Sequence, residues 1–82
     1  MATRDDLVDW LHDALVASGG RGRIPDLCKV VWDKHARDLE ASGELFYTWQ
    51  YDIRWAAYHL RKAGKLKSHT LSPKGVWELS GR

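Results

Sequence analysis

Three stretches of the chain repeat apolar residues at the spacing of an α-helix, and the first lies near the N-terminus. Its helical stripe consists of Leu7, Leu11, Ala14, Leu15 and Ser18, with Trp10 beside it. Thr3 is suited to cap the helix, because Asp6 follows three residues later and completes an acidic variant of the capping box. Gly19 and Gly20 are typical of a helix end. The pattern predicts a helix over residues 3–18, followed by "RGR" as an exposed linker.

The second stretch predicts a helix over residues 25–41. Pro25 is favoured at a first helical position, and Gly43 is a natural stop. The apolar stripe consists of Leu27, Cys28, Val31, His35 and Leu39. Because they lie on or beside this stripe, Cys28 is expected to be a small core residue and His35 to be partly buried and hydrogen-bonded.

A third helix is predicted over residues 48–63, with Thr48 as its N-cap and Gly64 at its end. The preceding "ELFYT" is short and β-prone, which indicates either a brief strand or an extended connector. At 100° per residue, one side of the helix is apolar and carries Trp49, Ile53, Ala56, Ala57, Leu60 and Ala63. The other side carries Gln50, Arg54, Tyr58 and Arg61, with Tyr51 and Lys62 nearby. Trp55 lies on a flank, and we expect it to pack under the following hairpin, against Trp77 or Leu66. The alternative role for Trp55 is a stacking surface for a flipped or modified base.

Residues 65–80 predict a β-hairpin. "KLKSHT" and "VWELS" alternate in character as strands do, and Pro73 and Gly75 mark the turn between them. The predicted fold class is therefore α+β: a small winged helix-turn-helix, three helices followed by a β-hairpin wing, in a single domain over residues 1–82. In that architecture the third helix enters the DNA major groove and the hairpin lies along the backbone.

Composition agrees with one small domain. The chain has 82 residues and five Trp, and large rings help a short chain to build a core. Cys28 is the single cysteine, which excludes an intrachain disulfide and a zinc site built on cysteine pairs. The N-terminal "MATRDDLVDW" contains no apolar run long enough for a signal or membrane segment. These features favour a cytoplasmic protein without membrane association.

Charge divides the chain into two unequal parts. Residues 1–53 hold six Lys and Arg against ten Asp and Glu, a net charge of −4. Residues 54–82 hold seven Lys and Arg against Glu78, a net charge of +6. Such asymmetry suggests one cationic face formed by the third helix and the hairpin. Cations that only solubilise an exposed helix and hairpin are the simpler alternative.

Double-stranded DNA is the partner that charge, helix order and the polar side of the third helix favour together. The predicted contact residues are Gln50, Arg54, Tyr58, Arg61, Lys62, Lys67, His69 and Lys74. Arginine suits guanine edges and glutamine suits adenine, whereas lysine serves mainly as a phosphate contact. The rival hypothesis is a winged helix that binds protein and not DNA.

The segments "RWAAYHLRKAGKL" and "SPKGVWELS" resemble the N-terminal winged-helix domain of Mrr-type restriction-system proteins. The resemblance covers roughly residues 46–80, and residues 1–45 fit only by helix order. In that family a nuclease domain usually follows, which needs an acid-x-Lys pair. No Asp or Glu of this chain has Lys two residues later. The resemblance therefore implies a DNA-binding part that acts with a separate effector or nuclease, stands alone, or belongs to a longer protein.

An enzyme is not expected. His12, His35, His59 and His69 lack the spacing of a helical metal pair, and neither a phosphate loop nor a nucleophile elbow is present. We accordingly assign no catalytic residue, no metal site and no cofactor from the sequence.

Overall fold

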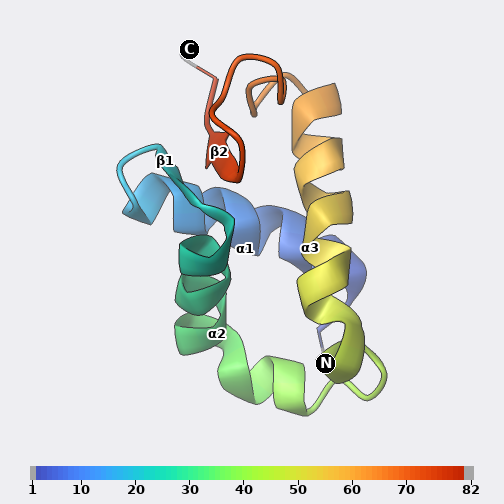
Figure 1. Ribbon diagram of the computed structural model, residues 1–82. Helices are drawn as coiled ribbons and strands as arrows, with labels where there is room; N and C mark the ends of the chain where they lie inside the picture. The colour runs from blue at the N-terminus through green and yellow to red at the C-terminus, as the bar shows by residue number, and fades with distance from the viewer. Residues whose placement is uncertain (1, 81–82) are drawn as a thin grey trace.

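Three helices and two short strands make up the computed structural model, which describes residues 2–80 (Figure 1). Their order is α1 (Arg4–Ala17), β1 (Arg21–Arg23), α2 (Ile24–Glu40), α3 (Leu45–Lys62) and β2 (Val76–Glu78). The structure is thus a small α+β fold, as predicted. The bounds of α1 and α2 agree with the predicted helices to within one residue at each end.

Helix α1 begins as the sequence predicts. The backbone N–H of Thr3 donates to Asp6 Oδ2 at 2.9 Å, which is half of a capping box. Its apolar stripe is fully buried and consists of Leu7, Leu11, Ala14 and Leu15. Helix α1 packs mainly against α3, which it crosses (Figure 1). Ala56 and Ala57 of α3 are completely buried, so the absence of large side chains there permits the two helices to approach closely.

Helix α2 contains a kink at His35, where φ is −128° and ψ is 18°. The imidazole of His35 lies parallel to the indole of Trp10, with ring centroids 3.8 Å apart and an interplanar angle of 4°. We predicted a half-buried, hydrogen-bonded histidine. His35 is half-buried, but aromatic stacking on α1 holds its ring.

Helix α3 begins three residues earlier than predicted, and the prediction of a strand or connector at "ELFYT" is wrong. Gly43, with φ of 62°, turns the chain, and Leu45 is already helical. The rings of Phe46 and Trp49 lie 6.3 and 6.2 Å from that of Trp32 on α2. Because these contacts require helical spacing, packing overrides the local β-propensity. Thr48 is not the N-cap but a residue of the first turn, and its hydroxyl donates to Asp52 Oδ2 at 2.8 Å.

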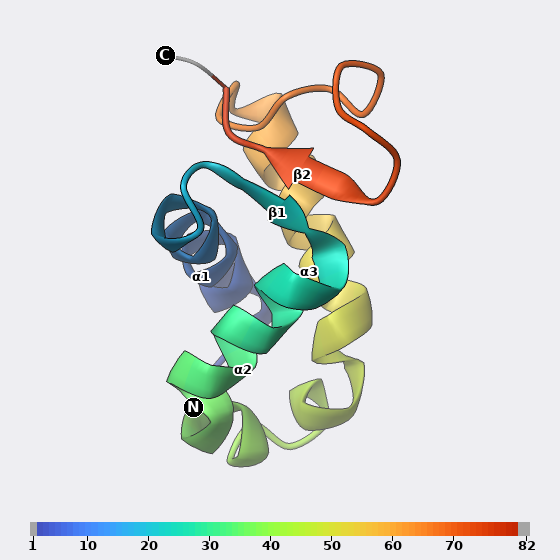
Figure 2. The ribbon, with the colours of Figure 1, turned by 60° about the vertical axis from the view of Figure 1, so that its left-hand side comes forward.

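The segment "RGR" is a strand and not the exposed linker that we predicted. It pairs antiparallel with β2, Arg21 opposite Glu78, Gly22 opposite Trp77 and Arg23 opposite Val76 (Figure 2). Gly22 fits because a Cβ at this position would lie 3.1 Å from a methyl of Leu27. Three residues without an apolar side chain carry no strand pattern, which is why sequence periodicity missed β1.

The predicted hairpin over residues 65–80 forms only at its base. Leu66 and Leu79 make an isolated antiparallel bridge, and the N–H of Lys67 donates to the Glu78 carbonyl at 2.9 Å. The rest of the predicted first strand turns away, because the N–H of Leu71 bonds back to Ser68. We call residues 67–75 the wing loop. Strand β2 therefore lies between β1 on one side and Leu66 on the other, and it holds Trp77 in the core.

Glu78 ties the wing loop to β1. Its carboxylate accepts a hydrogen bond from Ser72 Oγ at 2.8 Å and lies 3.3 Å from Arg21 and 4.0 Å from Lys67. Its side chain is only 12% exposed. The Ser72 hydrogen bond, followed by Lys67 and Arg21, lowers the pKa of Glu78, while desolvation opposes them.

We predict that Glu78→Gln destabilises the fold at neutral pH and much less in acid. A lowered folded-state pKa stabilises the fold above the ordinary value of 4.5, and that contribution is lost as the pH falls below it. Urea unfolding of both proteins at pH 7 and pH 3 measures the difference. Asp9→Asn, at an exposed position of α1, is the control. A difference between Glu78→Gln and wild type that is equal at the two pH values would contradict the prediction.

Candidate nucleic-acid interface

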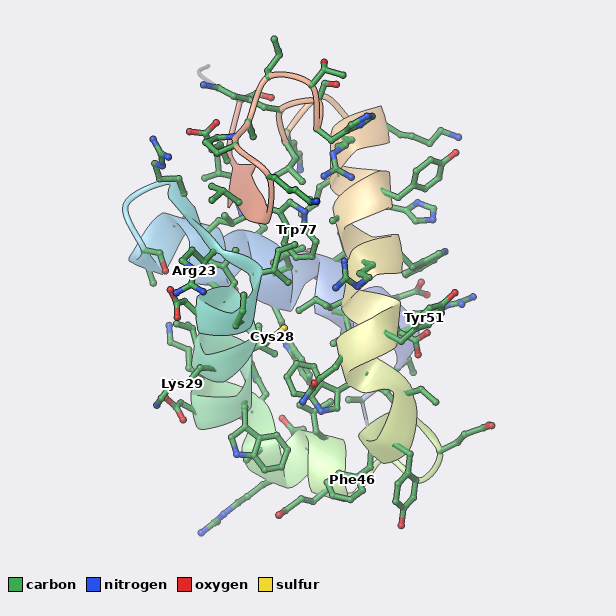
Figure 3. The ribbon with its side chains drawn as sticks, in the orientation of Figure 1. Arg23, Cys28, Lys29, Phe46, Tyr51 and Trp77 are labelled. Carbon is green, nitrogen blue, oxygen red and sulfur yellow. The ribbon has the colours of Figure 1, made fainter. Side chains whose placement is uncertain are left out.

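The outer face of α3 carries most of the residues predicted to contact DNA. Gln50, Arg54, Tyr58 and Lys62 are all exposed along it. Tyr51 also points away from the body of the molecule (Figure 3), and 77% of it is exposed. The ammonium of Lys62 lies 5.5 Å above the ring of Tyr58. This helix face therefore combines cations, an amide and aromatic rings, with Asp52, the only carboxylate of α3, bonded to Thr48 on another side.

Arg61 has a different position from the one predicted. It is half-buried, and its Nε donates to the backbone carbonyl of Lys67 at 3.2 Å. This bond joins the last turn of α3 to the start of the wing loop. Part of the guanidinium is thereby used inside the molecule, which makes Arg61 a support for the wing loop as well as a candidate contact.

The three predicted wing residues do not lie in one cluster. Lys67 is half-buried beside Glu78, whereas His69 and Lys74 are exposed at different points of the wing loop. Lys74 precedes Gly75, whose φ of 77° turns the chain into β2. Of the three, Lys74 is the residue that the fold brings toward α3, because both border the same groove.

This groove, of about 1110 Å³, lies between the first half of α2, the first half of α3 and the start of β2. Figure 3 shows Cys28 and Phe46 at the space between the two helices. The apolar lining of the groove consists of Ile24, Pro25, Cys28, Trp32, Phe46, Trp49 and Val76. Its polar lining consists of Arg23, Lys29, Gln50, Arg54 and Lys74, with the backbone of Gly75. We call it the α2–α3 groove.

Among residues 2–80, four cations and no carboxylate line the α2–α3 groove, so its charge is of one sign. Lys29 is paired with Asp33 at 3.0 Å. Within residues 2–80, Arg23, Arg54 and Lys74 form no ion pair. The groove therefore presents positive charge at its border above an apolar floor, an arrangement that attracts anions with an apolar part.

Sequence reasoning missed Arg23 and Lys29 as groove residues. Both lie in the part of the chain with net charge −4, whereas we predicted that the third helix and the hairpin form the cationic face. Arg23 comes to the groove because β1 pairs with β2 and sets it opposite Val76. That pairing joins residues more than fifty positions apart in the chain, and no local signal in the sequence predicts it.

Cys28 lies in the groove with its thiol half-buried. Burial raises the pKa of the Cys28 thiol above its ordinary value of 9.0, and the nearby Arg54 guanidinium partly opposes this. The thiol is therefore neutral at physiological pH and belongs to the apolar floor.

Trp55 does not lie where we predicted, under the wing. The guanidinium of Arg4 in α1 lies 4.3 Å above its ring, and His59 lies 4.2 Å away. This is the flank of α3 that faces the start of α1. Trp55 is half-buried there and covers the core from that side.

Among residues 2–80, no group of three His, Cys, Asp or Glu side chains is placed to bind a metal. No helix of this part of the chain is long and apolar enough to cross a membrane. Comparison of the chain with protein-family models, with curated proteins and with solved structures yields no match. The resemblance to Mrr-type winged-helix domains stays a prediction.

We predict that Arg54→Gln shifts the pH profile of Cys28 alkylation to higher pH. Removing the cation leaves burial unopposed, so the thiolate becomes scarcer and alkylation at pH 8 slows. Iodoacetamide labelling followed by mass spectrometry from pH 7 to pH 10 gives the profile. Arg37→Gln, at the exposed end of α2, should leave it unchanged. An unshifted profile in Arg54→Gln would show that Arg54 does not lie beside Cys28.

Proposed function

We propose that this chain is a double-stranded DNA-binding module of the winged helix-turn-helix type. One observation carries the proposal: the exposed face of α3 presents Gln50, Arg54, Tyr58 and Lys62 together, and Lys74 of the wing loop borders the same groove as Gln50 and Arg54. The geometry suits a helix that enters the major groove while the wing loop lies on a phosphate backbone.

The distribution of carboxylates supports the same partner. Asp52 bonds to Thr48, and Glu78 is surrounded by Ser72, Arg21 and Lys67. Neither acid stands free beside the cations of α3 and the wing loop. A phosphate approaching this surface therefore meets uncompensated positive charge, which is the main source of protein–DNA affinity.

The side chains divide into two roles. Arg54 is the best candidate for reading guanine, because its planar fork is exposed and unpaired among the described residues, and Gln50 beside it suits adenine. Lys62 and Lys74 act as phosphate contacts that position the helix. Lys67 contributes less, since Glu78 partly neutralises it, and Arg61 acts chiefly through the wing loop that it holds. His69 is a peripheral contact at the wing loop.

We assign the chain no catalytic role of its own. Its biological output then depends on a separate effector, either a nuclease or another protein that acts where the module is bound.

Protein binding is the second candidate function, and one observation favours it. Three tyrosines on α3 are unusually open to solvent: Tyr47 is 83% exposed, Tyr51 77% and Tyr58 53%. Tyrosine is enriched in protein interfaces. A chain that fails to bind duplex DNA at low salt would support this alternative.

We expect duplex binding to weaken steeply as salt is added. Contact of Lys62 and Lys74 with two phosphates gives a slope of log affinity against log salt of about −2, at about 0.9 per phosphate. Fluorescence anisotropy with a labelled 20-base-pair duplex from 25 to 200 mM NaCl measures it. Undetectable binding at 25 mM NaCl, or affinity that is independent of salt, would refute the proposed function.

We expect the substitutions Arg54→Ala and Lys74→Ala to affect DNA binding in different ways. Arg54→Ala is expected to cost about 1–3 kcal/mol on a preferred site, selected from a random duplex library, and to reduce discrimination between sites. Lys74→Ala should weaken all duplexes by a similar factor and reduce the salt slope by about 0.9. Lys34→Ala, at an exposed position of α2, is the charge-matched control. If both variants shift every duplex equally, α3 does not read bases.

A further inference from the structure

The α2–α3 groove is chemically unlike a surface that only contacts phosphates. Its floor is apolar and aromatic: Trp32 and Trp49 stack with centroids 6.2 Å apart and an interplanar angle of 13°, and the Phe46 ring lies 6.3 Å from Trp32. Trp49 is almost fully buried, whereas Trp32 and Phe46 are half-buried. A phosphate backbone makes no favourable contact with an aromatic surface of this kind. The groove therefore suits a ligand with a planar apolar part.

The residues at the border of the groove indicate which other chemical groups that ligand has. Within residues 2–80, Arg23, Arg54 and Lys74 form no ion pair and no carboxylate lines the groove. Gln50 is the one side-chain amide in the lining, and it offers both a donor and an acceptor. A planar ring with hydrogen-bonding edges that is attached to an anion satisfies all three features. A nucleotide has this composition.

The position of the groove indicates where such a nucleotide comes from. Gln50 and Arg54 belong both to the exposed face of α3 and to the lining of the groove. A base that swings out of a duplex through the major groove emerges beside the helix bound there. On the α2 side of α3 it meets the groove, with the phosphates on either side of it near Arg23 and Lys74. The volume of about 1110 Å³ exceeds that of most small-ligand pockets and leaves room for the base with part of its backbone.

We infer that the α2–α3 groove receives a single nucleotide that is unstacked from the duplex bound by α3, with its base on the floor of Trp32 and Phe46. The inference rests on the proposed DNA-binding function. It makes the module selective for duplexes in which one nucleotide leaves the stack at little cost, such as those with an unpaired or mispaired base.

The test compares two labelled duplexes of identical flanking sequence, one fully paired and one with a single bulged adenosine. Anisotropy titration of the full chain should show about tenfold tighter binding of the bulged duplex, because stacking on an aromatic side chain favours the extruded base. Equal affinities for the two duplexes would overturn the inference and leave the proposed function standing. Binding of neither duplex would overturn both.

Two variants test whether the preference for the bulged duplex arises at the floor of the α2–α3 groove. Phe46→Leu removes a ring of the floor and should abolish most of the tenfold preference while changing affinity for the paired duplex by no more than about twofold. Tyr51→Leu removes a ring of α3 that points away from the groove and should preserve the preference (Figure 3). A preference that survives Phe46→Leu, or that Tyr51→Leu abolishes, places the unstacked base elsewhere and overturns the inference.

A second measurement needs no variant. Cys28 lines the groove and is the single cysteine of the chain, so its alkylation reports occupancy. At saturating concentrations the bulged duplex should slow Cys28 alkylation at least threefold more than the paired duplex does. Equal protection would contradict the inference. Deoxyadenosine monophosphate is the probe for a free nucleotide: protection by it at micromolar concentration, without any preference for the bulged duplex, would assign the groove to free nucleotides and not to an extruded one.

Discussion

The pairing of β2 with β1 is the interaction on which the surface of this protein depends. Each strand contributes three residues to this pairing. The pairing is decisive because it joins segments that are far apart in the chain. The pairing continues beyond the strands, since the N–H of Ile24 donates to the Gly75 carbonyl and that of Leu79 to Gly20. These bonds fix the start of α2 against the end of the wing loop. Without them, Arg23 and Lys74 would not border a common groove.

Glu78 extends this junction from the backbone to the side chains. One carboxylate holds Ser72 and Lys67 of the wing loop together with Arg21 of β1. The same contacts that stabilise the loop partly neutralise the charges of Arg21 and Lys67. Stability and binding charge are thus distributed over different residues: Glu78 orders the loop, and Lys74 is left free for an anion.

The α2–α3 groove combines both halves of the chain in one surface. Aromatic residues of α2 and α3 provide its floor, and the cations around it come from β1, α2, α3 and the wing loop. Net charge by sequence segment describes this poorly, because Arg23 belongs to an acidic segment and still faces the groove. Positive charge beside partly accessible aromatic rings distinguishes the surface from a helix face that is merely hydrated, and it is the physical basis of both proposed functions.

The sequence by itself determined the three helices and the α+β class, because helical periodicity, a capping residue and glycine stops are local signals. It also placed Gln50, Arg54, Tyr58 and Lys62 on an exposed side of the third helix, since a helical wheel needs only the 3.6-residue period. Tertiary structure alone decided the remainder. Packing of Phe46 and Trp49 against Trp32 turned a β-prone segment into the first turn of α3, and pairing with β2 made a strand of "RGR". The contact with Arg4 places Trp55 against the start of α1. The α2–α3 groove is lined by segments that are distant in the chain and come together only in the folded structure. These features depend on contacts between distant residues, and a pattern of neighbours along the chain holds no information about such contacts.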